Sequence, residues 1–346
     1  MRTQIGVLLP TRELAMTGCY DLAPVLDFAR QAEAAGFDSV WTGDSPLARP
    51  RLDPLVVLSA VAAVTTEVTL GTAALTATLR PPVLGAAMVA SLDHAAPGRL
   101  QLALGSGFPI PDTQREFAAC GVPFSERVGR LDETVRLWRR AWQAGGQQGG
   151  ADAGGQQGGV GAGGRQGGAD AGGGAGAPAR FEGRYWSVED LDRLAPPATP
   201  GGPPLWLAAS DAPGAVERTA RLYDGWLPFV PTPEAYAAAW REIQRRAAAH
   251  GRPADAIVPG MYATVTVNPD RDRAEAELEE YLQHYYGRPL AVMSTVQAYC
   301  YGTAEECAAW LSRYVQAGAR HLVVRIGSLD PATQLKTVAE EVCPAV

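Results

Sequence analysis

The sequence contains few groups that could hold a metal ion or build a disulfide framework. Its 346 residues include five cysteines, and none of them forms a CxxC pair. The four histidines lie far apart along the chain, without the HxxxH spacing of metal ligands. We therefore expect free thiols, which commonly behave as small buried hydrophobes, and no metal site.

Positive charge is also scarce, and lysine is almost absent. Lysine and arginine together number 30 against 37 aspartates and glutamates, which gives a formal net charge of -7, and Lys336 is the single lysine. This balance argues against a nucleic-acid-binding surface. The chain also lacks a secretory hydrophobic segment and any long apolar run, so we expect a cytoplasmic protein with no membrane partner.

One segment, residues 145–179, is nearly all glycine, alanine and glutamine. It holds 17 of the 39 glycines, and its run from Gln147 to Gly155 nearly recurs from Arg165 to Gly173. Such a composition cannot bury enough apolar surface to offset the entropy lost on ordering. We predict a low-complexity disordered loop within a single domain that spans residues 1–346. Without the loop, about 310 residues remain, a normal length for one α/β barrel.

Outside that segment, short β-rich runs alternate with amphipathic helical patterns. The runs with strand character are residues 4–9, 39–41, 69–73, 100–104, 205–208, 225–227, 257–267 and 321–325. The helical patterns cover residues 22–35, 54–64, 82–92, 125–142, 214–222, 233–250, 304–317 and 331–342, with a further helical excursion from Arg271. Regular alternation predicts a parallel sheet, and eight strands favour a closed (β/α)8 TIM barrel over an open doubly wound sheet.

In a barrel the chemistry lies where the strands end, so the loops after the strands form the candidate site. The second strand is followed by a carboxylate and a hydroxyl, Asp44 and Ser45. The next three strands end mostly in small residues, which are Ala73, Ala74, Gly105, Ser106, Gly107, Ala208, Ala209, Ser210 and then Asp211. Small side chains let a flat group approach the backbone, so these ends predict a broad slot for a planar ring system.

The helical pattern from residue 304 begins with a capping box, in which Thr303 is the cap and Glu306 its partner. A helix N-terminus near the last strands of a barrel often faces a phosphate. A capping role and a phosphate-binding role for Gly302 and Thr303 both stay open at this point.

Several motifs, taken as an ordered set, resemble those of the luciferase-like monooxygenase superfamily. They are GFDSVWTGD at 36–44, LGTA at 70–73, GRLQLALGSG at 98–107, GVPFSERVGRLDE at 121–133, FEGRY at 181–185, DGW at 224–226 and GT at 302–303. The resemblance implies an α/β barrel that uses either reduced FMN with oxygen or the deazaflavin coenzyme F420 with hydride chemistry. Chain length and compact loops are more similar to the F420-dependent branch.

The resemblance also implies roles for particular residues. Asp44 and Ser45 would lie beside the cofactor ring, and Ala73 and Ala74 match a bulge where relatives carry a non-proline cis peptide. The residues implied to contact the ribityl and phosphate parts are Gly105, Ser106, Gly107, Ala208, Ala209, Ser210 and Asp211, with Gly302 and Thr303 closing the phosphate end.

Two residues depart from the pattern of F420-dependent dehydrogenases. Ser45 stands where many of these enzymes carry histidine, and Phe108 stands where the sugar-phosphate dehydrogenases carry glutamate. An acid–base pair for alcohol oxidation is therefore not visible, which favours reduction of an electron-poor C=C or C=N bond in a small organic substrate. We expect Ser45, Arg49 and Phe108 to contact that substrate, and Arg49 would suit a substrate carboxylate or an acidic cofactor tail.

Reduction of such a bond also needs a proton donor, and His284 is the candidate. It lies in an aromatic cluster that should pass over the barrel mouth, with Tyr285 and Tyr286 as alternative donors and a purely structural surface cluster as the competing interpretation. Two other functions stay open, an FMNH2-dependent monooxygenase supplied by a separate flavin reductase and a non-catalytic flavin-binding barrel. A flavin or F420 reductase as the source of reduced cofactor, and a homodimer, are the partner hypotheses.

Overall fold

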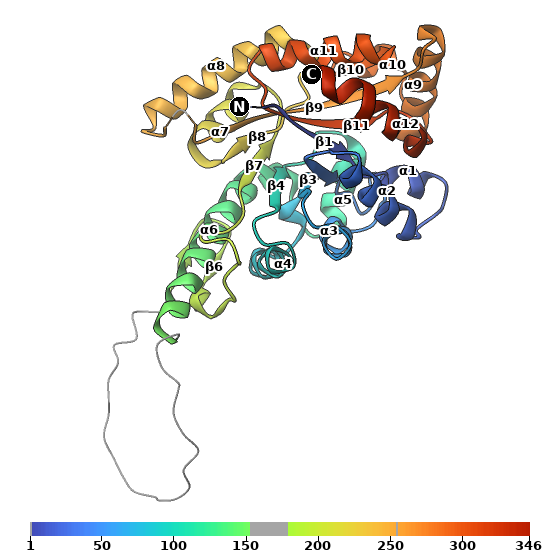
Figure 1. The fold of residues 1–346 in the computed structure, drawn as a ribbon. Coiled ribbons are helices and arrows are strands. Elements are labelled where there is room, and N and C mark those ends of the chain that lie inside the picture. The colour runs from blue at the N-terminus through green and yellow to red at the C-terminus, as the bar shows by residue number, and fades with distance from the viewer. Residues whose placement is uncertain (1, 153–178, 254) are drawn as a thin grey trace, which may run out of the picture.

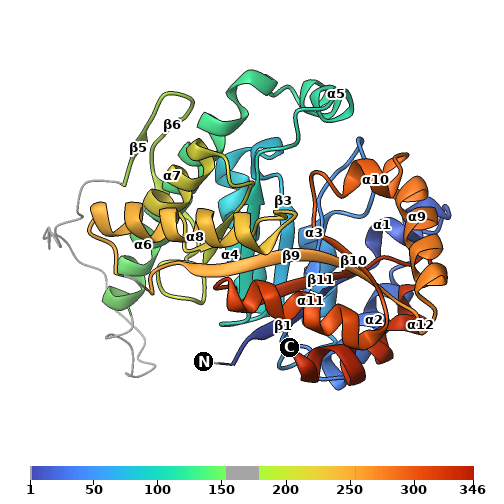
Figure 2. The same ribbon diagram turned by 90° about the horizontal axis from the view of Figure 1, so that it is seen from above.

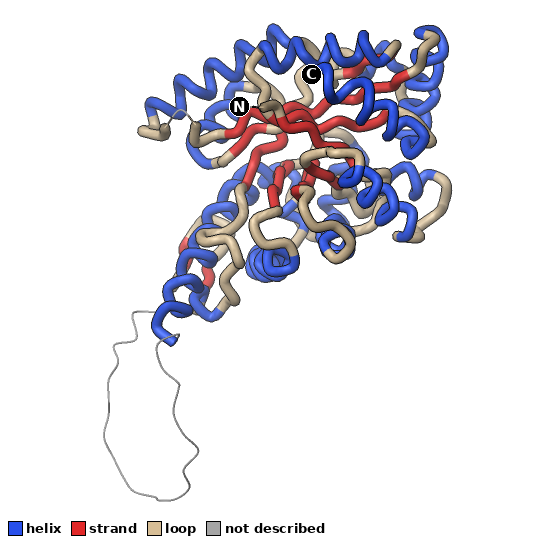
Figure 3. Tube along the Cα trace, viewed as in Figure 1, coloured by secondary structure: helices blue, strands red, loops and turns tan. Residues whose placement is uncertain are grey.

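The computed structural model describes residues 2–152, 179–253 and 255–346, and its centre is a sheet of parallel strands enclosed by helices (Figures 1 and 3). Eight strands close into a barrel in the order β1-β2-β3-β4-β7-β8-β9-β11, with β11 pairing back to β1. They are β1 (Gln4–Leu8), β2 (Ser39–Thr42), β3 (Thr69–Leu75), β4 (Leu100–Gly105), β7 (Leu205–Ala208), β8 (Gly225–Trp226), β9 (Val258–Val267) and β11 (His321–Ile326). The predicted TIM barrel is confirmed, and each strand lies within two residues of its expected bounds.

A ninth strand, β10 (Tyr299–Gly302), was not predicted from the sequence. β9 pairs with the short strand β8 only through Val258 and Pro259, and its carboxyl half pairs with β10 instead. Since β11 occupies the other edge of β9, β10 takes the place that β8 leaves open. The segment between β9 and β11 therefore adds an extra strand to the sheet at this corner.

Helices cover the outside of the barrel and follow the strands in turn (Figure 2). They are α1 (Thr11–Met16), α2 (Ala23–Ala34), α3 (Pro54–Ala62), α4 (Pro82–Ala95), α5 (Pro111–Ala119), α6 (Arg127–Asp152), α7 (Pro213–Leu222), α8 (Pro233–Ala249), α9 (Arg271–Tyr286), α10 (Leu290–Met293), α11 (Ala304–Gln316) and α12 (Pro331–Thr337). Six of them begin with proline, whose fixed φ suits the first turn and whose missing N–H costs nothing there. The side-chain oxygens of Asp53, Thr232, Asp270 and Thr303 cap α3, α8, α9 and α11.

The predicted loop at 145–179 is partly corrected by the structure. Helix α6 does not end at Trp142, as its amphipathic pattern suggested, but continues to Asp152. A hairpin of β5 (Phe181–Glu182) and β6 (Ser187–Val188) follows Ala179, which is itself buried. The remainder of the predicted loop, residues 153–178, lies outside the described residues.

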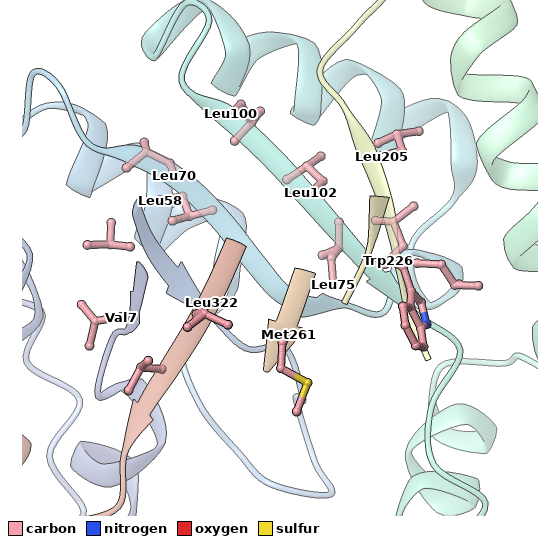
Figure 4. Packing of buried hydrophobic residues seen from close by; sticks show 14 of the residues in the cluster. Val7, Leu58, Leu70, Leu75, Leu100, Leu102, Leu205, Trp226, Met261 and Leu322 are labelled. Atoms are coloured by element: carbon pink, nitrogen blue, oxygen red, sulfur yellow. The ribbon is translucent and has the colours of Figure 1, made fainter. Parts of the chain in front are cut away.

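The main core lies between the barrel and the helices. Leu70, Leu100, Leu102 and Leu205 project outward from neighbouring strands and pack with Leu58 of α3 and other apolar side chains (Figure 4). These residues are almost wholly buried. Burial of a leucine side chain contributes on the order of 2 kcal/mol, so this layer fixes the helices against the barrel.

A second, smaller core fills the barrel interior. The indoles of Trp41 and Trp206 are fully buried there, with ring centroids 5.6 Å apart. Space for them comes from glycines on neighbouring strands, because a Cβ on Gly71 would lie within 3.0 Å of the Trp41 ring and one on Gly225 within 3.0 Å of the Trp206 ring. The two tryptophans therefore close the barrel beneath its carboxyl-terminal mouth.

His321 sits among these indoles with both rings edge-on to it, at centroid distances of 5.4 Å to Trp41 and 5.3 Å to Trp206. Ser39 Oγ accepts the Trp41 indole N–H at 2.7 Å, which leaves the serine hydroxyl to donate to His321 Nε2 at 2.8 Å. Burial lowers the pKa of His321 to about 4. The imidazole is thus held neutral, and His321 has a structural role at the bottom of its strand.

This histidine predicts acid-dependent stability. Because the folded pKa of about 4 lies below the unfolded value of 6.5, the contribution is complete above pH 6.5 and is lost as pH falls towards 4. The loss amounts to about 3 kcal/mol in the free energy of unfolding. Urea unfolding of the wild type and of His321→Gln should show this pH slope only in the wild type. His94→Gln, at an exposed histidine, is the control, and an equal slope in both His321 forms would contradict the assignment.

Candidate functional site

A cavity of about 650 Å³ opens at the carboxyl ends of the barrel strands. Its walls come from the loops after β2, β3, β4 and β7, from the start of α7, and from α9. Expected residues that line it are Asp44, Ser45, Arg49, Ala73, Ala74, Gly105, Ser106, Gly107, Phe108, Ala208, Ala209 and Ser210. The structure thus brings together most of the residues that the sequence singled out.

The floor of the cavity is formed by the small residues of β3 and β4. The peptide bond between Ala73 and Ala74 is cis, and the pairing of β3 with β4 shifts register between Ala73 and Leu75, as the family resemblance implied. A Cβ on Gly105 would lie 3.2 Å from the Ala74 Cβ and would meet nothing else within 4 Å. The missing side chain at Gly105 therefore keeps the floor open.

Glycine is required at position 107 for a different structural reason. Its φ is +81°, a left-handed conformation that favours glycine, and a Cβ there would meet Phe117 and Thr113 of α5 at 2.9 and 3.0 Å. A side chain at this position would press on α5 as well as strain the backbone. Gly105 is therefore the better probe of the cavity floor.

Asp44 is held in place by Arg80. The Asp44 side chain is 4% exposed, and its carboxylate accepts from Arg80 Nη1 at 2.7 Å and from the Thr76 N–H at 3.0 Å. Arg80 also pairs with Asp53 at 2.5 Å. Burial raises the pKa of the Asp44 carboxyl, while the Arg80 guanidinium opposes that shift. Arg80 ties the loop after β2 to the segment between β3 and α4, a role that the sequence alone did not reveal.

Ser45 and the residues after it are organised by Glu116 of α5, which was also not predicted. Glu116 is 3% exposed, and its Oε1 accepts from Ser45 Oγ at 2.7 Å and from the Leu47 and Ala48 N–H groups. Ser45 Oγ in turn accepts the Arg49 N–H at 2.8 Å. The hydroxyl of Ser45 is therefore engaged in shaping this loop, which presents Arg49 to the cavity.

His284 does not lie over the cavity, which corrects the expectation from the sequence. It is exposed, and its Nδ1 lies 2.9 Å from the Glu280 carbonyl oxygen of its own helix. One residue along α9 turns the side chain by about 100°, so the neighbours Tyr285 and Tyr286 line the cavity instead. The alternative donors, rather than His284, are in position.

Gly302, Thr303 and Asp211 also lie outside the cavity lining. The Thr303 hydroxyl accepts the Glu306 N–H, and the Glu306 carboxylate accepts the Thr303 N–H, which completes the capping box. Arg271 then pairs with Glu306 at 3.0 Å. The Glu306 carboxylate already occupies this helix N-terminus, so the capping role, rather than phosphate binding, accounts for Gly302 and Thr303.

A different helix N-terminus does face the cavity, that of α7. Ala212, Gly214 and Ala215 line the cavity there, together with Arg218 and Arg127. Arg218 forms a bidentate pair with Asp132, at 2.8 Å from Nε and 2.7 Å from Nη2 to the same carboxylate oxygen. Arg127 Nε is buried and has no hydrogen-bond partner in the described chain. The motif at 121–133 contained Arg127, yet no spacing rule pointed to its cavity-facing side chain.

The opposite wall is aromatic and basic. It contains Tyr262, Tyr285, Tyr286, Arg49 and Arg51. Arg51 Nη2 donates to the Tyr285 hydroxyl at 3.2 Å, and the Arg49 guanidinium lies 4.8 Å from the centroid of the Tyr286 ring. The cavity thus has a small-residue floor with a basic group at each end.

A model of the luciferase-like monooxygenase family matches residues 3–321 of the chain. The protein belongs to this family. The resemblance seen in the sequence motifs is thereby confirmed. A curated relative from Kineococcus radiotolerans, an F420-dependent glucose-6-phosphate dehydrogenase, is 33% identical over 210 residues, which cover 58% of this chain. The alignment spans 50% of the relative, so the chain spans about half the length of the first curated relatives that it matches.

Solved structures of the same architecture cover the whole chain. An F420-dependent secondary alcohol dehydrogenase in complex with an F420-acetone adduct has a TM-score of 0.76 and 20% identity, over 100% of this chain and 99% of its own. The monooxygenase RslO1 from Streptomyces bottropensis has a TM-score of 0.73 and 20% identity, over 99% of each chain. At these identities the comparison establishes the barrel fold of this luciferase-like family member.

The family member shows no cluster of three or more potential metal ligands among its described residues. In the same residues, no helix is both long enough and apolar enough to cross a membrane.

The Asp44–Arg80 pair gives a stability prediction for the site. Arg80→Met should lower the free energy of unfolding by about 3 to 5 kcal/mol, because it leaves the buried Asp44 carboxylate without its charged partner. Urea unfolding at neutral pH measures the change. The double variant with Asp44→Asn should recover part of the loss, and a double variant no more stable than the single one would show that the pairing is not the cause.

Proposed function

We propose that the protein is an oxidoreductase that binds the deazaflavin coenzyme F420 and reduces a small organic substrate. The observation that carries this proposal is the arrangement of the cavity, in which a floor of alanine and glycine runs towards a helix N-terminus and towards Arg127, whose Nε has no hydrogen-bond partner in the described chain. The curated relatives named as F420-dependent dehydrogenases support the same cofactor.

The residues present fit such a cofactor at both of its ends. A planar ring needs a flat surface without large side chains, which the floor at Ala73, Ala74 and Gly105 provides. A phosphate needs N–H donors and positive charge, which the Gly214 N–H at the start of α7 and the Arg127 side chain would supply. Pro213 has no N–H, and the Ala215 N–H already bonds to the Ala212 carbonyl. Arg218 adds charge but is already bound to Asp132.

The cofactor assignment is tested by direct titration. The apo-protein should bind F420 more tightly than FMN, with the dissociation constants measured by fluorescence. Gly105→Val should weaken F420 binding at least tenfold, because the added side chain rises from the floor beside Ala74, while the melting temperature changes little. Gly107→Val is the contrasting control, since it strains a left-handed backbone and should lower the melting temperature. Tighter binding of FMN would overturn the F420 assignment.

When bound in its reduced form, a deazaflavin would supply a hydride, and the protein must then deliver a proton to the reduced substrate. Ser45 is engaged with Glu116, and Phe108 is apolar, so neither offers an acid–base partner for alcohol oxidation. This supports reduction of an electron-poor C=C or C=N bond, which needs only one proton donor.

We infer that Tyr286 is this donor. Tyr286 lines the cavity, and its hydroxyl donates to Gln297 Oε1 at 3.3 Å, while Arg325 Nη1 donates to it at 2.8 Å. Burial raises the pKa of Tyr286, but the Arg325 charge and hydrogen bond, assisted by Arg49, outweigh burial and lower it below 10. A lowered pKa makes the phenol a stronger acid, and Arg325 stabilises the phenolate that remains.

This role predicts an alkaline limb in the pH profile. Tyr286 acts as an acid only while protonated, so turnover should fall as pH rises through a pKa below 10. Tyr286→Phe should slow turnover about 10²- to 10⁴-fold and abolish that limb, with cofactor affinity retained. Tyr299→Phe is the matched control, because Tyr299 shares Gln297 but does not line the cavity. An unchanged rate in Tyr286→Phe would contradict the assignment.

An FMNH2-dependent monooxygenase is the second candidate, supported by the similar fold of the monooxygenase RslO1. It would consume oxygen and need a separate flavin reductase, whereas the F420-dependent reaction would not consume oxygen. A non-catalytic flavin-binding barrel would bind cofactor without turnover. Oxygen uptake with reduced FMN, measured beside substrate reduction with reduced F420, separates these functions.

A further inference from the structure

Four arginines gather at the carboxyl ends of β11, β1 and β2. They are Arg325 at the end of β11, Arg12 just after β1, and Arg49 and Arg51 in the loop after β2. Arg325 is 1% exposed, and the other three are partly buried. The carboxylate among them is Glu13, which is 6% exposed and accepts from the Tyr281 hydroxyl at 2.5 Å.

Positive charge therefore exceeds negative charge in this cluster. Within the part of the chain that the structure describes, none of the four arginines forms an ion pair. Arg218, which also lines the cavity, is paired with Asp132, and Arg80 nearby is paired with Asp44. Like charges held together in a partly dry site repel one another unless an opposite charge joins them.

Arg325 has its own neutral partners. Its guanidinium donates to Thr264 Oγ1 at 3.0 Å and to Tyr286 at 2.8 Å, and the Tyr285 ring centroid lies 4.7 Å away. These contacts stabilise a buried cation without cancelling its charge. Arg325 therefore adds positive potential to the site but has few donors left for a ligand.

Arg12 is less well satisfied. It donates to the Pro50 carbonyl at 3.2 Å, but its Nε is buried without a hydrogen-bond partner in the described chain, and so is Glu13 Oε2. Burial, followed by the charges of Arg51 and Arg49, lowers the pKa of Arg12. The cluster therefore has an excess of positive charge and also contains buried polar atoms without hydrogen-bond partners.

Arg49 and Arg51 line the cavity and have N–H groups that donate to no described residue. The Arg49 guanidinium has no hydrogen-bond partner among the described residues and rests over the Tyr286 ring. Arg51 is held by Tyr285 and by the Arg49 carbonyl, and its Nη1 fills the space that a Cβ on Gly43 would need. Two guanidiniums with free N–H groups on one wall can bind a carboxylate or phosphate through charge-assisted hydrogen bonds.

The cluster lies away from the floor assigned to the cofactor. The floor belongs to β3, β4 and β7, whereas the arginines follow β11, β1 and β2, which form the neighbouring arc of the barrel. The phosphate end assigned to the cofactor is at α7, beyond β7. An anion at Arg49 and Arg51 would thus lie on the substrate's side, next to Tyr286.

We propose that the substrate of this enzyme is an anion whose carboxylate or phosphate group binds Arg49 and Arg51. The location of the substrate rests on the proposed function, but the anion site itself does not. The bound group would place the reducible bond near the Tyr286 hydroxyl and would complete the charge of the cluster. Neutral substrates of the same shape would leave the arginines unpaired and bind more weakly.

The test begins with the apo-protein and simple probes. Calorimetric titration with benzoate and with inorganic phosphate should show binding, and the neutral isostere benzamide should bind at least tenfold more weakly than benzoate. Arg49→Gln should weaken benzoate binding about ten- to a hundredfold, the loss expected for hydrogen bonds between charged groups. Arg49→Lys, which keeps the charge, should restore part of the affinity.

Arg288→Gln is the matched control, since it removes the same charge from an exposed position just beyond α9. Arg51→Gln is the second variant, with its melting temperature measured to confirm folding. Equal binding of benzoate and benzamide, or equal losses in Arg49→Gln and Arg288→Gln, would overturn the proposal.

A final comparison tests whether the anion that binds Arg49 belongs to the substrate or to the acidic tail of the cofactor. Titration of Arg49→Gln with F420 and with a deazaflavin that lacks the glutamate tail should give unchanged affinities for both. A loss confined to the tailed cofactor would assign the site to the tail and overturn the substrate proposal. Failure of F420 to bind the wild type, with benzoate binding intact, would contradict the cofactor assignment and leave the anion site standing.

Discussion

Two indole rings inside the barrel determine where a ligand can bind. Trp41 and Trp206 fill the interior from β2 and β7, in space left by glycines on the neighbouring strands, and His321 completes the layer between them. Because protein interiors tolerate little overpacking, this layer leaves no room for a ligand within it. The cavity lies at the mouth above, where the strand ends carry alanine, glycine and serine.

The arginines around that mouth fall into two kinds. Arg80 and Arg218 are bound to buried carboxylates and act as structural ties between neighbouring elements. Arg49 and Arg51, together with the unpartnered Nε of Arg127, retain donors that the chain itself does not use. Since a buried cation without a partner is unfavourable, these groups are the natural places for anionic parts of a bound molecule.

Prediction from sequence succeeded for features that depend on the size of single residues or on the short repeat of apolar positions along a helix. The eight strands followed from alternation of β-rich runs with helical periodicity, and the small strand ends followed from residue size alone. The sequence pattern did not predict β10, whose four residues resemble the helical excursion around them. It also did not predict the end of α6, which continues into a glycine-rich stretch. Tertiary contacts override weak local preference at such places.

The sequence by itself determined the barrel, its family, the open floor at Ala73, Ala74 and Gly105, and the position of Asp44 and Ser45 at the mouth. Only the tertiary structure decided which side chains of the later segments reach the cavity. His284 and Tyr286 are two residues apart on one helix, yet one faces solvent and the other faces the ligand space. Similarly, Arg12 and Arg325 are 313 positions apart and reach the same side of the barrel mouth only because β11 pairs with β1. Helix phase and strand pairing are set by packing across the whole barrel, and no local pattern encodes them.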